Sequence, residues 1–165
     1  MGIYANSQLL ADSFAAKGYT TLIPDVFNGG AIPLNEFPTV ELLIWLVKGF
    51  DGKSPHIKTL RELGSGIEAA FVAHPSFVEE GELAALNGPL SIAAAGTDSI
   101  FPASKRHKSE AILAKTGQPY QITLFSGVEH GFGIRGDPNV KIQKFAKEQA
   151  FDQAVAWFNE HLLKV

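Results

Sequence analysis

The sequence lacks cysteine and has no long apolar run. Without cysteine, the chain can form no disulfide framework, no thiolate zinc site and no cysteine nucleophile. No apolar run approaches the roughly 20 residues that span a bilayer, and the N-terminus lacks the basic and apolar regions of a signal peptide. We therefore expect a cytoplasmic protein with no membrane partner.

The chain also has little net charge. Its formal charge is -3, and acidic and basic residues are interspersed, so no basic patch is available to hold nucleic acid. The 165 residues are 45% hydrophobic, which is enough for a buried core and unlike the composition of disordered chains. We expect one globular domain over residues 1–165.

Runs rich in β-forming residues alternate with helical patterns along the chain. Strands are predicted near residues 19–24, 68–74, 90–95 and 120–125. Helices are predicted at residues 6–18, 39–49, 54–64, 79–86, about 103–115 and about 140–163. This alternation favours the α/β class, as a three-layer sandwich with a mostly parallel sheet of about four strands and helices on both faces.

The first helix and the loop after the first strand have clear boundary signals. In "NSQLLADSFAAKG", Asn6 or Ser7 is the expected N-cap and Gly18 the C-terminal stop. The segment 26–38, "VFNGGAIPLNEFP", has the glycines and prolines of a surface loop that could border a site. Its glycines do not lie in the order that a phosphate-binding loop requires.

Two candidate catalytic residues follow neighbouring predicted strands. Asp98 lies in "GTDSIFP" and His130 in "SGVEHGFGIRGD". Active sites of parallel α/β sheets lie at the carboxyl ends of the strands, so we expect the two side chains at one sheet edge, within direct or water-bridged hydrogen-bond reach. An aspartate after a strand is also common as a helix N-cap or turn former.

These two segments resemble the acid and histidine segments of the dienelactone hydrolase family, within the α/β-hydrolase fold. "GIYANSQLLADSFAAKGYTTLIPDVFNG" and "FVAHPSF" are also similar to the family, the latter to its fungal members, so the likeness covers most of the chain. The resemblance implies hydrolysis of a small ester or lactone by a nucleophile-His-Asp triad without cofactor or metal, with Asp98 as acid and His130 as base. Substrate-binding roles are also expected for Ile3, Tyr4 and Arg135. Arg135 could meet a substrate carboxylate through a bidentate contact, or it could simply be an exposed loop arginine.

The resemblance further implies that parts of the family's fold are missing. The family's nucleophile elbow falls between the helix that here ends "TLRELG" and the strand that here begins "IEAAFVAH", where this sequence has only "LGSG". The family's N-terminal strands precede the segment that "GIYAN" resembles, so this sequence has no counterpart of them. We therefore expect a partial dienelactone hydrolase-like domain with a truncated α/β-hydrolase fold, whose exposed sheet edges promote self-association.

No serine is a strong candidate for the missing nucleophile. Ser65 is a glycine-flanked turn residue, Ser7 is expected to cap a helix, and Ser126 lies in a turn at the end of a strand. Whether the chain is an enzyme is therefore left open. One hypothesis is an ester or lactone hydrolase, whose turnover through a covalent intermediate is expected near background if the chain is complete. The alternative is a non-catalytic descendant that binds a small molecule or a partner subunit.

The acidic residues and histidines allow one further hypothesis, a metal site. A metal site made of Asp98, Glu129 and His130 is a third hypothesis, but an adjacent Glu-His pair lacks the i, i+4 spacing of common zinc motifs. His74 precedes a proline and is expected to end a strand. His107, in "SKRHKSE", is expected on a solvated helix face.

Overall fold

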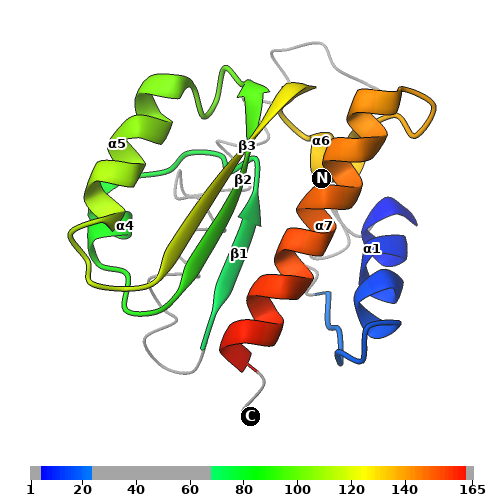
Figure 1. Cartoon of the computed structure of the whole chain (residues 1–165), viewed down its shortest axis with the longest axis horizontal. Coiled ribbons are helices and arrows are strands. Elements are labelled where there is room, and N and C mark those ends of the chain that lie inside the picture. Colours follow the sequence, from blue (N-terminus) through cyan, green and yellow to red (C-terminus); the bar gives the residue numbers. More distant parts are fainter. Residues whose placement is uncertain (1–4, 24–67, 163–165) are drawn as a thin grey trace, which may run out of the picture. The chain divides into compact units, whose positions relative to one another are not determined.

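The structure is a computed structural model that describes residues 5–23 and 68–162 (Figure 1). The chain divides into two compact units, Met1–Lys53 and Ser54–Val165, which are described separately below. The single domain expected over residues 1–165 stays a prediction. The predicted loop at 26–38 and the predicted helices at 39–49 and 54–64 lie outside the described residues.

The first unit contributes helix α1 (Ala5–Ala15). As predicted, the helix is stopped by Gly18, whose φ of +92° is in the left-handed region that glycine adopts without strain. The predicted N-cap is wrong: Asn6 and Ser7 lie inside the helix, because the helical conformation already begins at Ala5, a strong helix former.

The strand predicted at 19–24 is also wrong for the part that the structure describes. Residues 19–23 form neither helix nor strand. A β-rich run becomes a strand only when a neighbouring strand pairs with its backbone N–H and C=O groups, and no described residue does so here.

The second unit contains a parallel sheet of three strands, β1 (Ala70–Ala73), β2 (Leu90–Thr97) and β3 (Tyr120–Glu129). The strand order is β1-β2-β3, and both pairings are parallel. The predicted α/β class is confirmed, with three strands in the described sheet instead of about four. Self-association through the sheet edges stays a prediction.

Helices cover both faces of this sheet (Figure 1). Helices α4 (Glu80–Ala84) and α5 (Ala103–Leu113) lie on one face, while α6 (Phe132–Arg135) and α7 (Lys141–Leu162) lie on the other. The predicted helices at 79–86, 103–115 and 140–163 are therefore confirmed to within a few residues. No described helix has the length and apolar character needed to cross a membrane.

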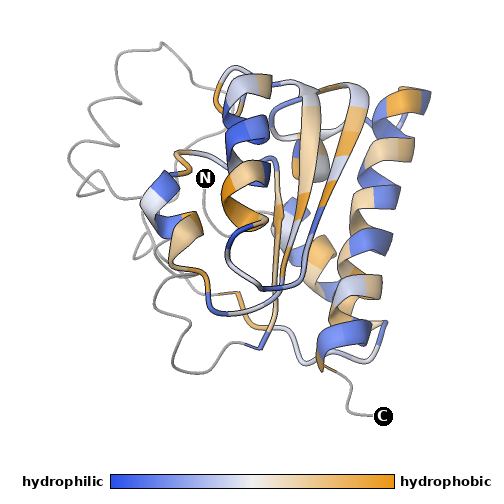
Figure 2. Ribbon diagram, turned by 60° about the vertical axis from the view of Figure 1, so that its left-hand side comes forward, coloured by the Kyte–Doolittle hydropathy of each residue, from blue (hydrophilic) through white to orange (hydrophobic). Residues whose placement is uncertain are grey.

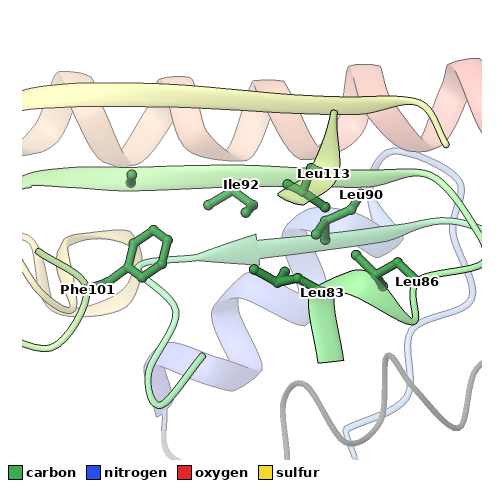
Figure 3. Packing of buried hydrophobic residues seen from close by; sticks show 7 residues of the cluster. Leu83, Leu86, Leu90, Ile92, Phe101 and Leu113 are labelled. Atoms are coloured by element: carbon green, nitrogen blue, oxygen red, sulfur yellow. The ribbon is translucent and has the colours of Figure 1, made fainter. Parts of the chain in front are cut away.

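Strand β2 is buried on both faces because it is the central strand. One set of its side chains packs with leucines from the α4 and α5 segments, in a cluster of Leu83, Leu86, Leu90, Ile92, Ala94, Phe101 and Leu113 (Figure 3). The alternate set, Ala93 and Ala95, packs against Ala146 and Ala150 of α7. A sheet with apolar residues on both faces needs a helical layer on each, which is what the fold supplies.

Helix α7 packs on the sheet through small side chains and one polar contact. Polar and apolar residues alternate along it (Figure 2), and Ala146, Ala150 and Ala154 form a buried row at i, i+4 spacing. The side-chain amide of Gln153 donates to Oγ of Ser91 at 2.8 Å, so the fully buried hydroxyl of this strand residue is hydrogen-bonded.

Candidate active site

The two predicted catalytic residues follow a register pair of neighbouring strands. Thr97, the last residue of β2, pairs with Glu129, the last residue of β3. Asp98 and His130 are the next residues along each strand. Parallel strands in register bring the following residues to the same carboxyl-terminal edge, so their proximity follows from the pairing.

A bulge in β3 lies just before the strand end that carries His130. The register pair before Thr97 is Ala95 with Phe125, so the single residue Gly96 opposes residues 126–128 of β3. Gly127 in the bulge has a φ of +75°. A Cβ on Gly96 would lie 2.9 Å from the backbone oxygen of Phe125, so this close approach of the two strands requires glycine.

The Asp98 carboxylate is buried and makes three hydrogen bonds. Its side chain is 1% exposed. Oδ1 accepts the backbone N–H groups of Ile100 at 2.8 Å and Phe101 at 2.9 Å, and Oδ2 lies 2.9 Å from Nδ1 of His130. Burial alone would raise the pKa of Asp98, but the hydrogen bonds from Phe101, His130 and Ile100 outweigh burial and lower this pKa below its ordinary value. The carboxylate is therefore ionised at neutral pH.

These contacts determine which nitrogen of His130 carries the proton. An ionised carboxylate can only accept, so Nδ1–H of His130 donates to Asp98. In a neutral imidazole, Nε2 then has a free lone pair. This atom lies 3.2 Å from Oγ of Ser76, whose hydroxyl can donate to it. The ring, 20% exposed, thus connects a buried carboxylate to a hydroxyl group.

Ser76 was missed by the sequence reasoning, which weighed only Ser7, Ser65 and Ser126 as hydroxyl candidates. It lies in the turn after β1, the third strand end at this edge. The signal was present in "FVAHPSF", because a polar residue two positions after a predicted strand lies at the same sheet edge as Asp98 and His130.

His74 packs behind this group. It continues the pairing of β1 by donating its backbone N–H to the oxygen of Ala93 at 2.7 Å, so it ends the strand as expected. Its ring centroid is 5.0 Å from that of His130, in an edge-to-face arrangement. Burial, followed by the charge of His130, lowers the pKa of His74 to about 4. His74 is therefore neutral at physiological pH.

The predicted substrate-binding residues are placed only in part. Arg135, the last residue of α6, is exposed and donates from its guanidinium to the backbone oxygen of His130 at 3.3 Å, so it lies beside the site. Ile3 and Tyr4 lie outside the described residues. Among residues 5–23 and 68–162, no group of three or more His, Asp or Glu side chains is placed to hold a metal ion.

Known proteins resemble this chain in sequence and in fold. Residues 57–162 match the model of the dienelactone hydrolase family. Hydrolase pyvD of Aspergillus violaceofuscus is 42% identical over an alignment of 187 positions, gaps included, which covers 96% of this chain and 76% of pyvD. Hydrolase tropI of Talaromyces stipitatus is 40% identical over an alignment of 199 positions, gaps included, which covers 96% of this chain and 77% of tropI.

A solved structure extends the likeness to the fold. The crystal structure of a candidate dienelactone hydrolase from Klebsiella pneumoniae has a TM-score of 0.72 at 13% identity, over 97% of this chain and 83% of that chain. Both fungal alignments are longer than the 165 residues of this chain, so pyvD and tropI carry residues inside the aligned region that have no counterpart here. The family match over more than half of the chain and the two relatives at 40% identity or above show that this chain belongs to the dienelactone hydrolase family.

Proposed function

We propose that this protein hydrolyses small carboxylic esters or lactones, with His130 as general base and Asp98 as the residue that orients it. One observation carries the proposal: the 2.9 Å hydrogen bond between Nδ1 of His130 and Oδ2 of Asp98 at the carboxyl ends of adjacent strands. Membership of a hydrolase family and the hydrolase names of pyvD and tropI support the same reaction class.

The pair has the properties that a general base requires. Asp98 fixes the imidazole with its acceptor nitrogen, Nε2, directed away from the carboxylate. When Nε2 takes a proton from an attacking O–H group, the ionised carboxylate stabilises the imidazolium that forms. The same nitrogen then returns the proton to the departing alkoxide, so His130 acts first as base and then as acid.

The test is ester hydrolysis by the purified full chain. We expect turnover of p-nitrophenyl acetate or of a dienelactone above the buffer rate, and loss of that turnover in His130→Gln. His107→Gln is the matched control, since His107 lies on the exposed face of α5 and should leave the rate unchanged. Turnover equal in wild type and His130→Gln, or wild-type turnover at the buffer rate, would refute the proposal.

A second candidate function is binding of a small molecule or a partner subunit without turnover. The observation that favours it is that pyvD and tropI carry residues in the aligned region that this chain lacks. A protein of this kind should show no ester hydrolysis, yet its thermal unfolding midpoint should rise when a lactone is added. Turnover that depends on His130 would exclude it.

A further inference from the structure

We propose that Ser76 is the nucleophile of this site and forms an acyl-enzyme intermediate with the ester substrate. The inference rests on the proposed function and adds the group that attacks. The sequence alone predicts near-background hydrolysis because it contains no strong candidate for a hydroxyl nucleophile. The structure supplies one.

The geometry of Ser76 is that of a hydroxyl next to its base. Its Oγ lies 3.2 Å from Nε2 of His130, and Nδ1 of the same ring is held by Asp98. In the part of the chain that the structure describes, it is the only side-chain hydroxyl within hydrogen-bond distance of this nitrogen. A nucleophile, a base and an orienting carboxylate linked in this order are the functional parts of a triad, whatever their order along the chain.

The backbone on both sides of Ser76 adopts strained conformations. His74 has a φ of +39° and Phe77 a φ of +53°, in the left-handed region that residues other than glycine rarely adopt. Pro75, which is buried between them, has its φ fixed by its ring. Strain of this kind persists where the surrounding structure holds it, and it is concentrated at functional sites. A tight turn after a strand is also how the nucleophile elbow of α/β-hydrolases presents its serine.

Because none of the 165 residues is a cysteine, no thiol of this chain can attack at this site. A hydroxyl already held against Nε2 is better placed than a free water, because bringing a separate molecule into position costs entropy. Ser76 is also only partly buried, so it is not enclosed in the core.

The reaction proceeds in two balanced steps. In the first, Oγ of Ser76 bonds to the ester carbonyl carbon while Nε2 of His130 takes the hydroxyl proton. The C–O bond to the alcohol then breaks, and the leaving oxygen takes that proton. In the second step, water attacks the acyl carbon and gives its proton to Nε2. The bond to Oγ breaks, Oγ regains the proton, and the carboxylic acid leaves.

The test combines turnover with direct labelling of the serine. The full chain and its Ser76→Ala variant are assayed on p-nitrophenyl acetate and treated with a fluorophosphonate, and the modified peptide is mapped by mass spectrometry. We expect wild type to be labelled at Ser76, and Ser76→Ala to lose the label and roughly a thousandfold or more of the turnover. The exposed Ser126→Ala is the matched control and should behave as wild type. Unchanged thermal unfolding of both variants shows that they fold.

A second measurement does not depend on turnover. Because the chain has no cysteine, Ser76→Cys introduces a single thiol at the site. Its alkylation by iodoacetamide should slow about tenfold or more when His130→Gln is added, since the base that generates the thiolate is then lost. Alkylation of the matched Ser126→Cys should not respond to His130→Gln. Equal responses of the two thiols would overturn the inference.

The outcomes separate this inference from the proposed function. Turnover that needs His130 but survives in Ser76→Ala, without labelling of Ser76, overturns the inference and leaves the hydrolase function standing, with water or another hydroxyl as the attacking group. Labelling of Ser76 that depends on His130, without ester turnover, supports the inference and refutes the proposed function. Neither labelling nor turnover overturns both.

Discussion

The rings of His74 and His130 meet edge to face, with their centroids 5.0 Å apart. Charging both imidazoles at this distance would be unfavourable, because the two positive charges repel each other. Burial and the neighbouring His130 lower the pKa of His74 to about 4, with the charge of Arg135 acting in the same direction. His74 therefore stays neutral at physiological pH, so in the proposed reaction only His130 of the two exchanges protons with the substrate and its leaving group.

The difference between the pKa of His74 in the unfolded chain and in the folded chain predicts a pH-dependent stability. One substitution should remove this dependence. The unfolded chain binds a proton at His74 near pH 6.5, whereas the folded chain binds it only near pH 4. As the pH falls between these values, stability should fall by about 2–3 kcal/mol because of this residue. His74→Phe keeps an aromatic ring but cannot titrate, so this part of the slope should disappear.

The measurement is urea unfolding of both proteins at about pH 7 and about pH 4.5, which bracket most of this window. The exposed His107→Phe serves as the control and should keep the wild-type slope. The same loss of stability in His74→Phe as in wild type would show that His74 is not held neutral by the fold.

Replacing Asp98 by asparagine should reverse the imidazole. The amide oxygen of Asp98→Asn can still accept the N–H groups of Ile100 and Phe101, but the NH₂ group then points at Nδ1 of His130. Nδ1 must accept, so the ring proton moves to Nε2 and the base is lost. Hydrolysis at neutral pH should fall by about four orders of magnitude, as in serine protease triads.

The tautomer itself can be read from the ¹⁵N chemical shifts of His130, which should exchange their protonated and unprotonated values in Asp98→Asn. Asp137→Asn is the control, because Asp137 also accepts a backbone N–H but is exposed and is not among the hydrogen-bond partners described for the imidazole. A decrease of less than tenfold in Asp98→Asn would contradict the assigned role.

Substitution of two glycines with positive φ distinguishes the effect of backbone strain from the effect of a change beside His130. Gly131 has a φ of +93° and Gly117 a φ of +71°, so alanine at either position should cost about 1–2 kcal/mol of stability. A Cβ at Gly117 meets nothing within 4 Å, whereas one at Gly131 would collide with the guanidinium of Arg135. Arg135 would then have to leave its hydrogen bond to His130.

We therefore expect both variants to unfold at lower temperature, and only Gly131→Ala to show altered kcat/KM for ester hydrolysis. Thermal unfolding and steady-state kinetics on the two proteins check this. An equal kinetic effect of Gly117→Ala would mean that general destabilisation, and not the geometry beside His130, is responsible.

The exposed edge of the sheet predicts concentration-dependent self-association. Strand β3 ends the described sheet, and its Leu124 is 48% exposed. An unprotected edge strand with apolar side chains pairs readily with another chain, and a lysine there opposes such pairing. Sedimentation velocity of wild type should show species heavier than 17.8 kDa at high concentration, and Leu124→Lys should reduce them.

Leu9→Lys is the matched control, since Leu9 is 62% exposed but lies on helix α1. It should leave the association unchanged. A wild-type protein that sediments as a monomer at every concentration would remove the expectation of self-association.

The sequence predicts the sheet-forming half of the chain well for identifiable reasons. Strand β2 is a largely apolar run because both of its faces are covered, and helices α5 and α7 have periodic patterns with clear ends. The proximity of Asp98 and His130 follows from the rule that carboxyl ends of parallel strands share an edge, and the structure confirms it. Their catalytic roles stay a prediction.

What the sequence does not predict depends on contacts between distant segments or on unusual backbone. The run at 19–23 has strand-forming residues, but pairing decides whether it is a strand. The turn that directs Ser76 toward His130 uses left-handed conformations at His74 and Phe77, residue types that do not signal such a turn. A glycine at either position would have marked it.

Each strand of the described sheet contributes one residue to the site from the turn that follows it. Ser76 and His130 are separated by 54 residues along the chain, and Asp98 and His130 by 32. Contacts of such long sequence separation form late relative to helices, because the intervening loops must first be closed. During refolding, the hydrogen-bonded chain from Ser76 to Asp98 can form only after β3 has joined the other two strands. Regain of function should then lag behind regain of helical circular dichroism, so the site reports on the completion of the sheet.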